Sequence, residues 1–119
     1  MSVTIDYTKG FFEPSPVAEK VGTITGTTLD LTSGNVFSYT PTADTTFVFS
    51  NPPTTGTAYG FTLKITPSAT VTLTWPASVD WAGGTAPDAP ASGATNVYTF
   101  LTQDGGTTYY GFLAGAAMA

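Results

Sequence analysis

The chain alternates apolar and polar side chains with a period of two along most of its length, most clearly in residues 59–66, YGFTLKIT. Successive side chains of a strand point to opposite faces, so this period predicts half-buried β-strands. Thirteen glycines and nine prolines interrupt the chain too often for long helices. The pattern predicts about eight strands, at residues 3–8, 23–31, 36–40, 45–50, 59–66, 71–75, 96–102 and 107–113.

Strands at this spacing predict an all-β fold, a single β-sandwich or jelly-roll-like domain of about eight antiparallel strands. We place this domain at residues 23–119. Residues 1–22 are expected to form an N-terminal strand followed by an extended arm, which carries Phe11 and Phe12. Pro14 and Pro16 exclude both a helix interior and a central strand at this point.

The residue inventory excludes most enzymatic chemistry. The chain has 25 threonines but no histidine, cysteine or arginine, and its net charge is −5. Nucleophilic triads and the usual zinc sites need histidine or cysteine. Three lysines neutralise few phosphates, so we expect no nucleic-acid partner and no anionic membrane partner. No signal peptide or membrane-spanning apolar run is visible, so we expect synthesis in the cytoplasm.

Carboxylates are the remaining candidates for catalysis. A glycosidase needs two of them roughly 5 to 9 Å apart. The acids here stand mostly beside glycine, proline, serine or threonine, where turns and capping explain them. Asp104 beside two glycines could ligate calcium through turn carbonyls, but no calcium-loop pattern surrounds it. The sequence therefore predicts a protein that is not an enzyme and holds no cofactor or metal.

The two tryptophans invite different interpretations. Trp75 ends an alternating strand, which indicates a core position. Trp81 lies in the longest stretch without a strand pattern, residues 77–92, and is expected to be partly exposed. It could stack on a sugar or pack against another subunit, since aromatic side chains offer large buried area in either case.

The last predicted strand is apolar on both faces. Tyr109, Gly111 and Leu113 share one face, and Tyr110 and Phe112 share the other. One face can fill the core, and the second needs another sheet, another subunit or the loop at residues 77–92 to cover it. This pattern is the main local indication of self-association.

Several segments, in this order along the chain, resemble a module of tailed-bacteriophage virion proteins that occurs at the C-terminal ends of tail-fibre chains. The resemblance covers roughly residues 29–119 and carries no catalytic residue. Its most specific parts are a Trp-Pro-Ala-Ser-Val segment and a glycine- and tyrosine-rich C-terminal segment. The segments are residues 51–53 NPP, 56–58 GTA, 61–63 FTL, 72–79 TLTWPASV, 81–87 WAGGTAP and 104–115 DGGTTYYGFLAG.

The resemblance also departs from the tail-fibre pattern, because only about 28 residues and no fibre shaft precede the module. A small β-domain with an extended arm is similar to capsid decoration (cement) proteins. That resemblance implies a homotrimer on the outer surface of the virion head, bound to the major capsid protein. It implies capsid contacts through the arm, at Phe11, Phe12, Pro14 and Pro16, and a subunit interface at Trp81, Tyr110 and Phe112.

Two alternatives stay open at this stage. Phe11 and Phe12 could pack on the protein's own core instead of a capsid. The whole module could instead be a tail-fibre or tail-adaptor binding domain that contacts host glycans through the loop around Trp81.

Overall fold

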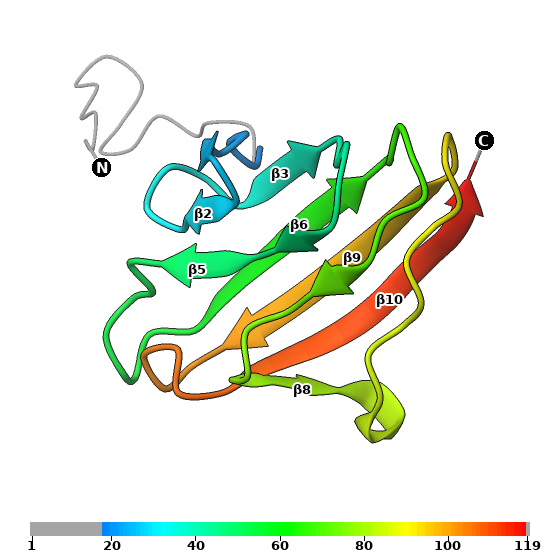
Figure 1. Cartoon of the computed structure of the whole chain (residues 1–119). Coiled ribbons are helices and arrows are strands. Elements are labelled where there is room, and N and C mark those ends of the chain that lie inside the picture. Colours follow the sequence, from blue (N-terminus) through cyan, green and yellow to red (C-terminus); the bar gives the residue numbers. More distant parts are fainter. Residues whose placement is uncertain (1–17, 119) are drawn as a thin grey trace, which may run out of the picture.

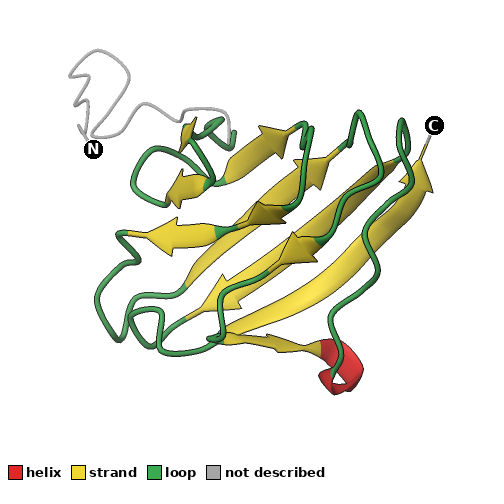
Figure 2. Cartoon of the chain, in the orientation of Figure 1, coloured by secondary structure: helices red, strands yellow, loops and turns green. Residues whose placement is uncertain are grey.

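A computed structural model describes residues 18–118, which form ten strands and one short 3₁₀ turn (Figures 1 and 2). The strands are short because glycine, proline and asparagine interrupt the alternating segments. Their bounds are β1 Ile24–Thr25, β2 Thr28–Asp30, β3 Val36–Tyr39, β4 Thr45–Thr46, β5 Val48–Ser50, β6 Tyr59–Ile65, β7 Leu73–Thr74, β8 Val79–Trp81, η1 Ala82–Gly84, β9 Thr95–Thr102 and β10 Tyr109–Met118.

These strands form one large sheet and two small ones. The large sheet has five strands in the order β3-β6-β9-β10-β8. The small sheets have the orders β1-β2-β5 and β4-β7. In Figure 2 the small sheets lie over one face of the large sheet, which places the apolar side chains between two layers. The predicted all-β, sandwich-like fold is therefore confirmed.

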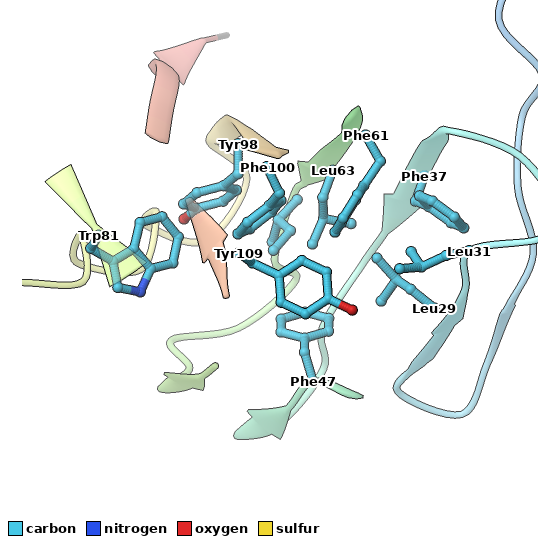
Figure 3. Packing of buried hydrophobic residues seen from close by; sticks show 11 residues of the cluster. Leu29, Leu31, Phe37, Phe47, Phe61, Leu63, Trp81, Tyr98, Phe100 and Tyr109 are labelled. Carbon is cyan, nitrogen blue, oxygen red and sulfur yellow. The ribbon is translucent and has the colours of Figure 1, made fainter. Parts of the chain in front are cut away.

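Aromatic side chains join the two layers. Phe49 of β5 places its ring 5.1 Å from the ring of Phe61, 5.2 Å from that of Phe100 and 5.0 Å from that of Tyr109, all centroid to centroid. These edge-to-face contacts add about 0.5–1.5 kcal/mol each beyond the burial of area. Figure 3 shows the buried side chains that surround them. The members of this buried cluster are Leu29, Leu31, Phe37, Phe47, Phe61, Leu63, Ile65, Trp81, Tyr98, Phe100 and Tyr109.

The expectation that all strands pair antiparallel is wrong. Antiparallel pairing holds for β1–β2, β6–β9 and β9–β10, whereas β2–β5, β3–β6, β4–β7 and β8–β10 are parallel. Alternation tells which face a side chain occupies but not the direction of the neighbouring strand. The chain moves to the other layer between β3 and β6, and it returns to the large sheet in the same direction.

Four predicted segments also differ in detail. The strand expected at residues 45–50 is divided at Phe47 into β4 and β5, which belong to different sheets. The strand expected at residues 23–31 is split into β1 and β2 by a turn at Gly26, whose φ of 63° favours glycine. The stretch at residues 77–92 is not wholly irregular, because it contains β8 and η1. The last strand, expected to end at residue 113, continues to Met118.

The described chain begins beside β3. The amide of Gly22 donates to the carbonyl of Val36 at 2.8 Å, and the carbonyl of Lys20 accepts from the amide of Asn35 at 2.9 Å. These bonds fix the segment at residues 20–22 to the large sheet. The strand predicted at residues 3–8 and the arm residues Phe11, Phe12, Pro14 and Pro16 lie outside the described residues.

Candidate functional site

The two acidic side chains with the most hydrogen bonds, Asp30 and Asp104, stabilise turns. Asp30 Oδ1 accepts hydrogen bonds from Thr32 Oγ1 at 2.7 Å, from the Thr32 amide at 3.0 Å and from Asn51 Nδ2 at 3.1 Å. The bond from the Thr32 hydroxyl, together with the others, holds the pKa of Asp30 below its usual range. This carboxylate stabilises the turn that follows β2, and its lowered pKa makes it a poor proton donor at neutral pH.

Asp104 plays the same part in the connection from β9 to β10. Its Oδ1 accepts from the amide of Thr108 at 2.9 Å and from Thr102 Oγ1 at 3.2 Å. The bond from the Thr108 amide is the main cause that lowers the pKa of Asp104. These bonds give Asp104 a role in the turn. Within residues 18–118, no three His, Cys, Asp or Glu side chains gather as metal ligands would.

Acid should loosen this connection. Because the folded pKa of Asp104 lies below its unfolded value of 3.8, its stabilising contribution is present above that value and is lost as pH falls through the folded pKa. We expect the melting temperature to fall as the pH is lowered below about 4. The Asp104→Asn variant should melt lower at pH 7 and show a smaller fall in acid. Equal acid dependence in variant and wild type would contradict the role given to this carboxylate.

The candidate interaction surface is the face of the large sheet that points away from the small sheets, hereafter the outer face. Strand register aligns its side chains in rows that cross the sheet. Threonine and apolar residues dominate these rows, and Lys64 and Asp80 are their only charged members. The rows are Gly60–Leu101–Tyr110–Asp80, Val36–Thr62–Thr99–Phe112 and Ser38–Lys64–Val97–Gly115.

Large apolar side chains stand exposed on the outer face. Tyr110 exposes 46% of its surface, Phe112 47% and Leu101 42%. Leu101 lies directly opposite Tyr110 in the β9–β10 pair, so the two side chains form one apolar patch. Aromatic residues with few charges are typical of the centre of a protein–protein interface. Exposed apolar patches are common at interaction sites, so the outer face is the candidate surface.

Two hollows border this patch. One, of about 340 Å³, lies at the end of the sheet, where Tyr110 adjoins the turn residues Gln103 and Asp104 and the loop at Thr55. The other, of about 390 Å³, lies over Gly60, between Thr62, Thr99 and Glu19. The amide of Gly56 donates to the carbonyl of Gln103 at 3.1 Å, which ties the two loops of the first hollow together. Both hollows offer polar groups to a surface that docks on the outer face.

The structure separates the three residues predicted for subunit packing. Tyr110 and Phe112 lie on the outer face, as the alternation of β10 predicts. The expectation that Trp81 is partly exposed is wrong, because it exposes only 9% and belongs to the core. Its ring lies 5.2 Å from that of Trp75. It also lies 5.5 Å from the ring of Phe100, and Figure 3 shows these two side chains. Pairing of β8 with β10 turns this indole inward, so it leaves little surface for a sugar or a second subunit.

Sequence reasoning missed Leu101 as a surface residue. The signal that could have found it is the alternation within β9. Leu101 shares a face with Val97 and Thr99, whereas Tyr98 and Phe100 point into the core. An apolar residue on the face otherwise occupied by threonine marks the patch. The register with Tyr110 could not be read from the sequence, because six residues separate β9 from β10.

Comparisons with known proteins give no assignment: no protein-family model, no curated protein and no solved structure matches this chain. Among residues 18–118, no helix is long and apolar enough to cross a membrane.

Proposed function

We propose that this chain is a structural protein of a bacteriophage virion, a decoration protein that binds the outer shell of the head and stabilises it. The observation that carries the proposal is the outer face, a nearly uncharged surface on which Tyr110, Phe112 and Leu101 stand exposed. The acids with the most hydrogen bonds serve turns, which supports a binding role over catalysis. Its partners are the major capsid protein and further copies of itself, with a homotrimer as the assembly.

The stabilisation follows from mass action. A protein that binds the assembled shell but not its separated subunits shifts the equilibrium towards the shell, by about 2.7 kcal/mol per site at a hundred times the dissociation constant. No catalytic group is needed for this effect. Heads that lack the protein should therefore come apart at a lower temperature than decorated heads.

Immunogold labelling of intact virions tests the location. Antibody raised against the recombinant chain should label the heads of the phage that encodes it. Label on the tails would favour the alternative, a tail-fibre or adaptor module that contacts host glycans. Trp81, the ring expected to contact a glycan, is buried. In that alternative, the exposed ring of Tyr110 beside the 340 Å³ hollow would have to contact the glycan instead.

The proposed arm contacts can be tested by mutation. Replacing Phe11 and Phe12 together by serine should weaken binding to heads purified from a phage deleted for this chain. Interface aromatics often contribute 2 kcal/mol or more, so we expect a dissociation constant raised at least about thirty-fold. Sedimentation of the protein with the heads measures the affinity. Melting temperature should stay unchanged if these rings contact the capsid, and it should fall if they pack on the protein's own core.

A matched control replaces an exposed apolar residue outside the proposed contacts. Val48 of β5 exposes 47% and does not belong to the outer face, so Val48→Ser should bind heads as well as wild type. Full affinity of the Phe11→Ser, Phe12→Ser variant would overturn the role of the arm.

A further inference from the structure

The strand β10 has an open edge. On one side it pairs with β9 as far as Met118, and on the other side β8 pairs only with Tyr109, Tyr110 and Gly111. From Phe112 to Met118, no strand among residues 18–118 pairs with that second side. In Figure 1, β10 lies at the border of the sheet and the short β8 covers only its beginning.

This edge lacks two of the usual protections against strand addition, charge and proline. Proteins protect an exposed edge with short strands, charged side chains, proline or bulges. β10 is ten residues long, and its segment FLAGAAM at residues 112–118 has no charge and no proline. It does contain register irregularities, but the amide of the bulged residue Ala117 turns to Asn96 Oδ1, at 3.0 Å, on the β9 side. Ala117 has a φ of 52°, outside the extended region, so strand addition concerns residues 112–116.

The inner face beside this edge is also incompletely covered. Leu113 lies opposite Tyr98, which is fully buried, so the two share the inner face. Leu113 nevertheless exposes 38% of its surface. An added strand with apolar residues on its inner face would cover Leu113 and extend the core.

We propose that the open edge of β10 accepts residues 3–8 of a neighbouring copy as an additional strand. As a strand, that segment, VTIDYT, would place Val3, Ile5 and Tyr7 on one face and Thr4, Asp6 and Thr8 on the other. Its apolar face matches the uncovered inner face beside Leu113. Strand addition of this kind draws its affinity from main-chain bonds and its specificity from alternate side chains.

The position of residues 20–22 favours a neighbouring copy as the source. Val21 bridges to Val36 of β3, and β3 lies at the opposite edge of the large sheet from the β10–β8 side. The described chain thus begins on the side of the subunit opposite to the acceptor edge. Contacts between unlike surfaces are head-to-tail, and they form a closed ring when the rotation permits it. A ring of three is the proposed homotrimer.

The inference rests on the self-association within the proposed function but not on the capsid role. Its experiment therefore uses purified protein without phage particles. One variant lacks residues 2–8 and keeps the acceptor edge. A second carries Ala114→Lys and Ala116→Lys, which charge two exposed positions of β10 and leave the donor segment intact. The matched control carries Ala43→Lys and Ala91→Lys, two exposed positions in loops outside β8, η1 and β10.

Light scattering should find wild type and control as oligomers and each of the two variants alone as a monomer. An equimolar mixture of the two variants should form a heterodimer, because the first supplies an intact edge and the second an intact donor strand. Hydrogen exchange of residues 112–118 should be faster in the deletion variant than in wild type.

Three results would overturn the proposal. A deletion variant that remains oligomeric would show that another contact, such as β10 with β10, joins the copies. A monomeric wild type would show that the edge stays open or is filled within one chain. A mixture that stays monomeric, with both variants folded by circular dichroism, would show that the edge and the segment do not meet. If the lysine variant fails to fold, the deletion variant alone tests the proposal, through its molecular mass from light scattering and the hydrogen exchange of residues 112–118.

Discussion

Replacing Trp81 by alanine should destabilise the fold by about 3–5 kcal/mol, the range found when a buried tryptophan is truncated. Trp81 is 9% exposed, and its ring lies between Trp75, Tyr98 and Phe100. Its truncation leaves a cavity that aromatic neighbours fill poorly. A domain of this size is stable by about 5–15 kcal/mol, so the loss is a large part of the total. Urea unfolding followed by Trp75 fluorescence measures it.

The control for this change is Tyr110→Ala. Tyr110 is a large aromatic residue on the adjacent strand, but it exposes 46% of its surface on the outer face. We expect Tyr110→Ala to change the stability of an isolated subunit by no more than about 0.5 kcal/mol, as for other surface positions. If Trp81→Ala is equally mild, Trp81 is not a core residue, and its proposed place in a subunit interface regains support.

Much of the fold follows from alternation alone. The burial of Phe61, Leu63 and Ile65 in β6 follows the period of two that residues 59–66 show. The positions of Tyr109 and Tyr110 on opposite faces of β10 follow from the same rule. Local side-chain chemistry also identifies the turn at Asp104, because aspartate beside glycine accepts main-chain bonds there.

Strand partners could not be predicted in the same way. The parallel pairing of β8 with β10 joins Trp81 to Gly111, thirty positions away in the chain, and no local signal marks that contact. A Cβ on Gly111 would lie 2.9 Å from Trp81 Cε3, so this glycine allows the indole to lie against the sheet. The sequence shows a tryptophan in a glycine-rich loop, which indicates exposure. The long-range pairing of β8 with β10 buries Trp81 despite that indication. The candidate interaction site is therefore the outer face of β10 and not Trp81.

A second large effect is expected at Gly34, where two stretches of main chain meet. A Cβ at Gly34 would lie 2.4 Å from the Lys20 carbonyl oxygen and 2.7 Å from the Gly22 amide nitrogen. Both are main-chain atoms, which cannot rotate away as a side chain can. Gly34→Ala should therefore push residues 20–22 off the sheet and break the bond from the Asn35 amide to Lys20. We expect a loss of about 1–3 kcal/mol, as for other overpacked sites.

Gly60→Ala is the matched control, because a Cβ there meets only the Phe100 carbonyl oxygen at 3.6 Å, an ordinary contact. It should leave stability equal to wild type or slightly higher, since alanine restricts the unfolded chain more than glycine. Urea unfolding gives both stabilities, and hydrogen exchange at Gly22 and Asn35 locates the change. Equal stability of the two variants would show that residues 20–22 do not hold to β3. The proposed donor segment would then have no fixed origin at the edge opposite β10, and the head-to-tail assembly would lose its geometric basis.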